Sequence, residues 1–270
     1  MMIKNLFRDE SALTGENLIA LVGGSGFDEY PGLNITRVIE SETPYGLSAP
    51  ISFGEVIRTK PSVGVEGDVN RTVVFMPRHG SNHRTPPHLI NYRANLWALK
   101  NCGVTNVIAM NAVGGIHQEM GPGSLVFPHQ IIDYTYGREH TYFTGGESGV
   151  EHADFTEPFT EDWRQKLIAI GQQTGLKIKS SAVYGCTQGP RLESAAEINR
   201  LKNDGCDLVG MTVMPEAALA RELHLNYASI SIVVNWAAGL SPEPITIDAI
   251  YQQLESSKED VIKLLSAILP

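Results

Sequence analysis

Short apolar runs bounded by glycine, proline or polar residues mark the buried strands that this sequence predicts. The clearest runs are Leu18–Val22, Arg71–Met76, Thr105–Met110, Lys177–Tyr184, Asp207–Gly210 and Asn226–Val234. Two further stretches, Thr36–Glu40 and Ile51–Arg58, also have a β-like composition. The run that ends at Val234 is rich in Tyr, Ile and Val, and it places Asn235 where strand is expected to become loop.

Between these runs, apolar residues recur every three or four positions, which predicts amphipathic helices. The predicted helices are His88–Lys100, Glu161–Thr174, Leu192–Lys202, Pro215–Leu223 and a final helix that begins at Thr246. The final helix has the most regular apolar stripe, formed by Ile247, Ile250, Tyr251, Leu254, Val261, Leu264, Leu265 and Ile268. Asp133–Gly149 shows the least regular pattern in the chain.

The predicted strands alternate with helices, without a low-complexity linker or an internal repeat. This order predicts an α/β fold in which helices flank a mixed central β-sheet. We therefore expect residues 1–270 to form a single domain, with residues 1–17 as a loosely held N-terminal segment.

Composition restricts the classes of partner. The net charge of −9 argues against binding to nucleic acid or to an anionic membrane surface. No apolar run is long enough to span a bilayer. The three cysteines lie far apart, which is typical of reduced thiols in a cytoplasmic protein. A small anionic substrate is still compatible with this charge, because a local cluster of Arg and His can attract an anion.

Gly23–Gly26 follows the first predicted strand, as a phosphate-binding loop does. Backbone N–H groups in such a loop can converge on an oxyanion, and Ser25 can add a hydroxyl. The motif lacks the third glycine of a dinucleotide-binding fingerprint and the lysine of a P-loop. On its own, Gly23–Gly26 is equally compatible with a plain tight turn.

Arg78 and His79 follow another predicted strand. The guanidinium group is a permanently charged fork of donors, and a neighbouring imidazole can add one more donor to an oxyanion. His79 and His83 have the spacing of a helical zinc pair, but Gly80 and Pro86 argue against a helix there. We therefore predict no metal site.

Asn111–Gly115 and Thr212 follow two further predicted strands. Each of these motifs has a purely structural explanation. In open α/β sheets, however, the carboxyl ends of the strands form the ligand-binding edge. Together the motifs predict a site for a tetrahedral anion at that edge.

In this combination and order, the motifs resemble those of the trimeric purine nucleoside phosphorylases and methylthioadenosine phosphorylases, from about Leu18 to Ile268. The matching motifs are Gly23–Gly26, Arg78–Gly80, Asn111–Gly115, Gly189–Glu193, Gly210–Thr212 and Val233–Asn235. In this family, phosphate attacks the anomeric carbon of a nucleoside and releases the purine. The resemblance implies a homotrimer that uses inorganic phosphate as co-substrate and needs no cofactor or metal.

The resemblance also implies a role for each matching residue. Phosphate would be bound by Ser25, Arg78, His79, Thr212 and the backbone of Ala112. The base would be held by Leu192, Glu193 and Asn235, and the sugar and its 5′ group by Met211, Ile247, Ile250 and a neighbouring subunit's His152. The residues expected to act in catalysis are His79, Glu193 and Asn235.

Two positions of the base pocket predict the type of purine. Relatives that prefer 6-aminopurines have Asp in place of Asn235 and a second acid in place of Ala237. A 6-oxopurine presents an N1–H donor to the Glu193 carboxylate and an O6 acceptor to the Asn235 amide. Adenine presents a bare N1 lone pair to Glu193, which is repulsive. The sequence therefore predicts specificity for 6-oxopurines.

The region Pro244–Asp248 has no histidine, which inosine-cleaving relatives use to hold the 5′-hydroxyl. Ile247 and Ile250 would instead suit an apolar methylthio group. Leu192 departs from the Phe that relatives place over the base and sugar. An oxo-type base pocket beside an apolar 5′ pocket resembles the methylthioinosine-cleaving branch of the family. Inosine or guanosine, or methylthioadenosine, are the alternative substrates.

Two other classes of protein are less consistent with the sequence. A nucleoside sensor that has lost turnover would not need the phosphate motifs at Arg78, His79 and Thr212. A dinucleotide-dependent oxidoreductase would need the complete glycine fingerprint that Gly23–Gly26 lacks.

Overall fold

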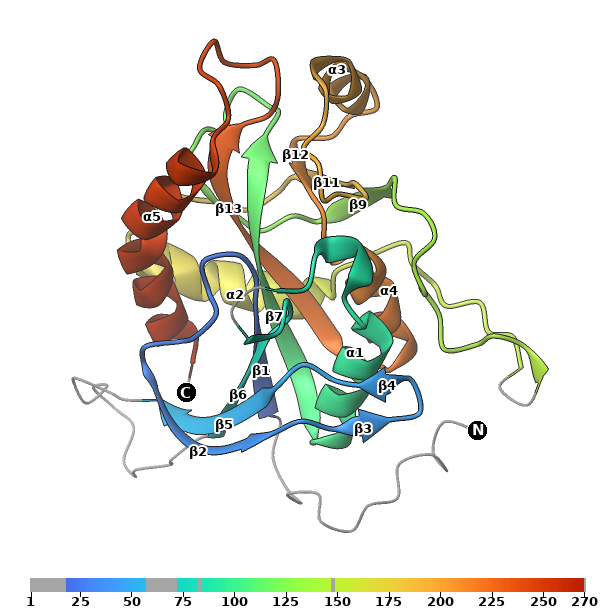
Figure 1. Ribbon diagram of the computed structural model, residues 1–270. Helices are drawn as coiled ribbons and strands as arrows, with labels where there is room; N and C mark the ends of the chain where they lie inside the picture. Colours follow the sequence, from blue (N-terminus) through green and yellow to red (C-terminus); the bar gives the residue numbers. More distant parts are fainter. Residues whose placement is uncertain (1–17, 57–71, 82–83, 147–148, 270) are drawn as a thin grey trace.

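A mixed β-sheet organises residues 18–56, 72–81, 84–146 and 149–269, which are the residues described in this computed structural model (Figure 1). Its main path runs in the order β10–β8–β13–β7–β1–β6–β5–β2. The strands of this path are β1 (Leu18–Gly23), β2 (Leu33–Ile39), β5 (Ile51–Val56), β6 (Thr72–Pro77), β7 (Val104–Gly115), β8 (Leu125–Val126), β10 (Ile178–Lys179) and β13 (Asn226–Trp236). The predictions for residues 1–17 and for His83 fall outside the described residues.

Three short strands extend the sheet beside the end of β7. They are β9 (Gln130–Asp133), β11 (Val183–Cys186) and β12 (Leu208–Gly210). β11 pairs with both of the others, and β12 runs antiparallel to the last residues of β7. A separate two-stranded sheet joins β3 (Glu42–Thr43) and β4 (Gly46–Leu47).

The central strands β6, β1, β7 and β13 are parallel to one another, so their carboxyl ends share one edge. Val, Ile and Ala fill these strands because helices cover both faces of the sheet. β7 is longer than predicted. The segment Asn111–Gly115, expected to be a loop, continues the strand and pairs with β13 on one side and β12 on the other.

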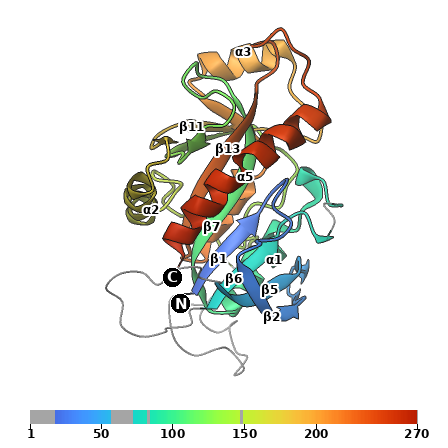
Figure 2. The ribbon, with the colours of Figure 1, turned by 90° about the vertical axis from the view of Figure 1, so that its left-hand side faces the viewer.

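Two pairs of helices sandwich the sheet (Figures 1 and 2). α1 (Tyr92–Asn101) and α4 (Val213–Glu222) pack in one core cluster, to which β1 contributes Ala20 and Val22. α2 (Glu161–Gln173) and α5 (Ile247–Ile268) pack in a second cluster, to which β1 contributes Leu21. This alternation along β1 reflects the two faces of a strand. The described residues thus form one α/β domain with a mixed sheet flanked by helices, as predicted.

Several predicted elements have other bounds in the structure. The helix predicted from His88 begins at Tyr92, as α1. Lys177–Tyr184, predicted as one strand, is divided between β10 and β11. α3 (Ala195–Asn203) begins later than predicted, because Ser194 forms a capping box with Glu197. Glu193 is therefore left in the loop before the helix. At the other end of the chain, the Thr246 hydroxyl caps α5 by accepting from the Ala249 N–H, as its residue type suggested.

No helix among the described residues is long and apolar enough to cross a membrane. Cys102, Cys186 and Cys206 are all free thiols. Within the same part of the chain, no group of three or more His, Cys, Asp or Glu side chains could hold a metal ion.

Candidate active site

A cavity of about 440 Å³ opens at the carboxyl edge of the parallel strands. Its walls come from the loops that follow β1, β6, β11 and β12, from the ends of β7 and β13, and from the first turns of α5. Of the residues predicted to form the site, all except His152 line this cavity: Ser25, Arg78, His79, Ala112, Leu192, Glu193, Met211, Thr212, Asn235, Ile247 and Ile250.

The glycine-rich turn after β1 packs directly on the floor of the cavity. A β-carbon at Gly24 would lie 2.5 Å from the Met110 carbonyl oxygen and 2.9 Å from Arg78 Nη1. Only glycine permits this approach. The Phe27 N–H donates to the Gly24 carbonyl across the turn (2.9 Å), which leaves the half-buried Ser25 within the turn, on the cavity wall.

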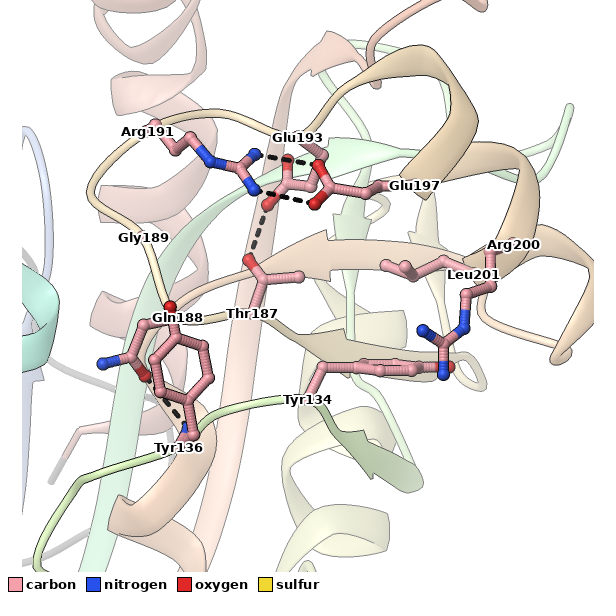
Figure 3. A pocket seen from close by; sticks show the side chains of 10 residues that line it. All are labelled: Tyr134, Tyr136, Thr187, Gln188, Gly189, Arg191, Glu193, Glu197, Arg200 and Leu201. Carbon is pink, nitrogen blue, oxygen red and sulfur yellow. Dashed lines mark hydrogen bonds and ion pairs between the residues drawn. The ribbon is translucent and has the colours of Figure 1, made fainter.

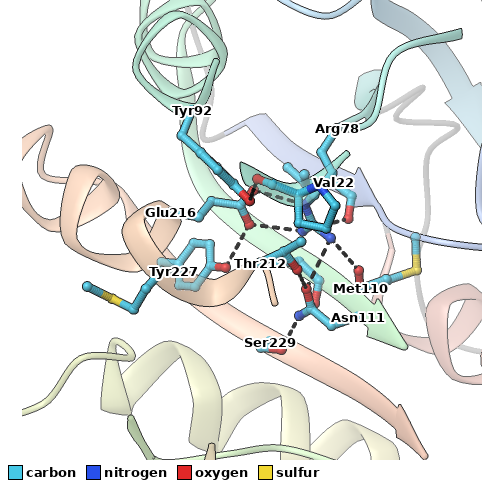
Figure 4. Close-up of polar contacts among 12 residues, drawn as sticks. Val22, Arg78, Tyr92, Met110, Asn111, Thr212, Glu216, Tyr227 and Ser229 are labelled. Carbon is cyan, nitrogen blue, oxygen red and sulfur yellow. Dashed lines mark hydrogen bonds and ion pairs between the residues drawn. The ribbon is translucent and has the colours of Figure 1, made fainter. Parts of the chain in front are cut away.

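Arg78 lines the cavity, but its polar groups are engaged by the surrounding chain (Figure 4). Its side chain is buried, with Nε and Nη2 donating to the two oxygens of Glu216 (3.0 and 2.9 Å). Nη1 donates to Met110 O (2.7 Å) and Asn111 Oδ1 (3.0 Å), and Nη2 makes a longer bond to Val22 O (3.5 Å). These bonds use all five N–H donors of the guanidinium. In this arrangement no N–H of the guanidinium is left over for a phosphate, and the direct contact predicted for Arg78 stays a prediction.

The Arg78–Glu216 pair is almost completely removed from solvent, and Glu216 also accepts from the Tyr227 hydroxyl (2.7 Å). Burial on its own would lower the pKa of Arg78, but the Glu216 carboxylate and the Tyr227 hydroxyl hold that pKa above its ordinary value. Hydrogen bonds to each charge offset the desolvation cost of a buried ion pair of this kind. Here it fixes the position of Asn111.

Asn111 connects the buried pair to Thr212. Its Oδ1 must face Arg78, because a guanidinium can only donate; its Nδ2 donates to Ser229 Oγ (2.6 Å). The Thr212 hydroxyl, 2.7 Å from the same Oδ1, therefore has to donate to it. In this arrangement the Thr212 oxygen can accept a further hydrogen bond but cannot donate one.

His79 is buried beside the same turn. Its Nδ1 lies 2.8 Å from the Thr85 carbonyl oxygen, and because a carbonyl only accepts, Nδ1 carries the proton. This bond sets the orientation of the imidazole ring at the cavity wall. Ala112, predicted to act through its backbone, lies within β7 opposite Ile232 of β13.

Glu193, in the loop between β11 and α3, lines the cavity and also the neighbouring pocket drawn in Figure 3. The Thr187 hydroxyl donates to Glu193 Oε1 over 2.5 Å. Gly189 has a φ of +63°, and a β-carbon there would lie 2.5 Å from Met211 Sδ. This loop therefore packs tightly against the turn that carries Met211 and Thr212.

Asn235 reaches the cavity because of a β-bulge. In the pairing of β13 with β7, Val233 lies opposite Val113 and Asn235 opposite Gly114, so that Val234 is the extra residue. A bulge re-aims the side chains that follow it, and bulges are common next to active sites. The prediction that Asn235 follows the strand is wrong, because β13 continues through it to Trp236. Its Nδ2 donates to the Trp236 carbonyl (2.7 Å), which orients the amide.

The first turns of α5 form the outer rim of the cavity. Ile247 and Tyr251, both members of the predicted apolar stripe, are 65% and 49% exposed, and both line the cavity together with Ile250. The buried stripe begins at Leu254. His152 is exposed and is not among the cavity-lining residues of its own chain.

The sequence did not single out Glu216 or Tyr251. Glu216 had a detectable signal, because it is the one charged residue in the apolar stretch Val213–Ala220 of α4, where a charge requires a buried partner. Tyr251 had none, since its spacing matches the core stripe of α5.

Comparisons with known proteins agree with this geometry. The phosphorylase superfamily profile matches residues 19–270. The chain is 47% identical to a curated Pseudomonas syringae pv. tomato protein named "Probable S-methyl-5'-thioinosine phosphorylase", covering 93% of this chain and 97% of that protein. It is 44% identical to the 6-oxopurine nucleoside phosphorylase of Pyrococcus furiosus, covering 93% and 92%. Methylthioadenosine phosphorylase from Schistosoma mansoni in complex with adenine superimposes with a TM-score of 0.84 at 31% identity, covering 93% of this chain and 90% of that one.

Proposed function

The chain belongs to the phosphorylase superfamily, and on that premise we propose that it catalyses phosphorolysis of S-methyl-5′-thioinosine. It is an enzyme of the purine nucleoside phosphorylase type, and phosphate is the co-substrate of phosphorylases. In the proposed reaction, the bond between the purine nitrogen and the anomeric carbon breaks, and a phosphate oxygen bonds to that carbon. The products are hypoxanthine and 5-methylthioribose 1-phosphate.

The observation that carries this proposal is the presence of Glu193 and Asn235 in one cavity with the anion-binding turn of Ser25. A 6-oxopurine can donate its N1–H to Glu193 and accept at O6 from the second N–H of the Asn235 amide. As the base leaves, negative charge develops on its rings. Donors already aimed at that charge lower the barrier without reorganisation.

On the phosphate side, we assign direct contacts to Ser25, His79 and the Ala112 backbone. Thr212, whose hydroxyl proton goes to Asn111, would contact monohydrogen phosphate by accepting from its O–H. Arg78 acts one step behind them, by holding Asn111 and through it Thr212. An oxocarbenium-like sugar gains its stabilisation from the adjacent phosphate, so aiming the anion is a large part of catalysis.

The 5′ pocket favours an apolar group, because Ile247, Ile250 and Met211 all line the same cavity. Inosine and guanosine are the second candidate substrates, since a relative at 44% identity is named as a 6-oxopurine nucleoside phosphorylase. We expect Ile247→His to lower the ratio of kcat/KM for methylthioinosine to that for inosine about 10-fold, because a methyl-sized apolar contact is replaced by a donor suited to a hydroxyl. Ile35→His, at another exposed isoleucine on β2, should leave this ratio unchanged.

The direct test of the proposed function is base release from methylthioinosine, inosine and guanosine, each with and without inorganic phosphate. Methylthioinosine should react fastest, and only when phosphate is present, with 5-methylthioribose 1-phosphate as the second product. Equal turnover without phosphate would identify a hydrolase. Faster cleavage of inosine would contradict the assignment of the 5′ pocket.

We further propose that the enzyme acts in the cytoplasm as a homotrimer in which His152 of one subunit completes the 5′ pocket of the next. The exposed Ile247, Tyr251 and Leu89 support this proposal, because a subunit interface would cover them. Light scattering on the purified protein should give three times the chain mass. A monomer with full activity would contradict the proposal.

A further inference from the structure

Arg138 is a buried arginine in the segment between β9 and α2. Its hydrogen bonds go to carbonyl, amide and phenol oxygens of the surrounding chain, and its guanidinium also lies 5.8 Å from the ring centre of Tyr92. Burying a charge on neutral acceptors is costly. The reaction as derived above does not use this residue.

Apart from the Tyr92 hydroxyl, the acceptors of Arg138 belong to two segments that pack against each other beside the cavity. Nη1 donates to the carbonyls of Met211 (2.8 Å), in the turn after β12, and of Met214 (2.6 Å), near the start of α4. Nη2 donates to the carbonyls of Thr187 (3.2 Å) and Gln188 (2.7 Å), in the loop after β11. One guanidinium therefore connects the turn that carries Met211 to the loop that carries Glu193.

Thr187 extends this set of hydrogen bonds to Glu193, the residue proposed to hold the base. Its N–H donates to the Gly210 carbonyl (2.8 Å), and its hydroxyl donates to Glu193 Oε1 (2.5 Å), as Figure 3 shows. A hydroxyl has one proton to donate, and the alternative acceptor, Gly210 O, lies at 3.4 Å. The shorter bond orients the Glu193 carboxylate plane and so the direction in which its second oxygen accepts.

We propose that Thr187 is a specificity-determining residue and Arg138 its positioning residue: together they hold Glu193 as an acceptor for the N1–H of a 6-oxopurine. This inference rests on the proposed function of Glu193. In this position the carboxylate accepts from N1–H and repels the bare N1 of adenine. Without the hydroxyl, the carboxylate rotates away from this position.

The test compares Thr187→Val, which keeps the shape and removes the hydroxyl, with Thr187→Ser, which keeps the hydroxyl. The readout is the ratio of kcat/KM for methylthioinosine to that for methylthioadenosine. We expect Thr187→Val to lower this ratio about 10-fold or more, because a hydrogen bond to a charged group is lost. Thr187→Ser should stay within about 3-fold of wild type on the same reasoning, and the KM for phosphate should not change in either variant.

This ratio is measured on a single preparation, so it does not depend on how much of a variant is folded. An unchanged ratio in Thr187→Val would overturn the inference while leaving the proposed function intact. A wild-type protein that cleaves no 6-oxopurine nucleoside would contradict the proposed function itself. Equilibrium binding of hypoxanthine and adenine to wild type and Thr187→Val then tests the inference without turnover, with the same shift expected.

Arg138 is tested by Arg138→Met alone and combined with Thr187→Val. If Arg138 acts through Thr187, both single variants lower the substrate ratio, and the double variant lowers it no further than Thr187→Val. Methylguanidinium added to Arg138→Met should restore part of the ratio. A double variant whose loss is the product of the two single losses, with no rescue, would show that Arg138 does not act through Thr187.

Discussion

Asn235→Asp is expected to lower kcat/KM for methylthioinosine about 10²- to 10³-fold, or about 3–4 kcal/mol of transition-state stabilisation. The amide that donates to O6 becomes a carboxylate that can only accept, so two sets of lone pairs face each other. The new charge also shares the cavity with Glu193. Both effects oppose the negative charge that develops on the leaving purine. Steady-state kinetics with saturating phosphate measures the loss.

Asn226→Asp is the matched control for this variant. It makes the same substitution in the same strand, at the exposed amino end of β13, where the side-chain amide donates to Asn106 Oδ1. It should retain wild-type kinetics. If Asn235→Asp also retains wild-type kinetics, Asn235 does not contact the base, and the assignment of the base pocket is wrong.

The second large effect is expected from Glu216→Gln, which leaves the Arg78 guanidinium buried without its counter-charge. Breaking one side of a buried ion pair costs about 3 kcal/mol or more of unfolding free energy. The loss should appear in urea unfolding followed by circular dichroism. The KM for phosphate should rise as well, because Arg78 then no longer holds Asn111 and Thr212 in place.

Glu197→Gln provides the comparison, because Glu197 makes a two-pronged pair with Arg191 on the surface. Exposed pairs contribute little to stability, so the unfolding midpoint of this variant should hardly move. A lower KM for phosphate in Glu216→Gln would contradict the positioning role of Arg78. It would mean that the released guanidinium binds the anion directly, as the resemblance first implied.

The local pattern of apolar residues was sufficient to predict the elements whose periodicity is set by packing against the core. β1, β6 and α2 lie close to their predicted ranges, because continuous apolar runs and a helical stripe each have one way to be buried here. The local pattern was insufficient where pairing with a distant strand decides whether a segment is strand or loop. Asn111–Gly115 contains two glycines and looks like a loop, yet it is strand because β13 and β12 pair with it on either side.

The same limit applies to the site. Motifs that follow strands could be placed at one edge because parallel strands end together, and the cavity contains them. The contacts behind them could not be predicted. Arg78 meets Glu216 across 138 positions of sequence, and Arg138 meets Met214 across 76. The spacing of residues along the sequence does not indicate contacts between positions so far apart.

The 5′ pocket illustrates a third case. Ile247 and Tyr251 continue the apolar stripe of α5 in sequence, but the helix extends past the edge of the core and presents them to the cavity. Periodicity states which face of a helix is apolar. It does not state whether that face meets a core, a ligand or another subunit.

Selection for a keto group at the purine 6 position is the claim on which the rest depends. It is tested most directly by the ratio of kcat/KM for methylthioinosine to that for methylthioadenosine in the wild-type protein with saturating phosphate. A site built from matched hydrogen bonds should favour methylthioinosine by about 10⁴-fold. Equal rates, or a preference for methylthioadenosine, would show that Glu193 and Asn235 do not select the base.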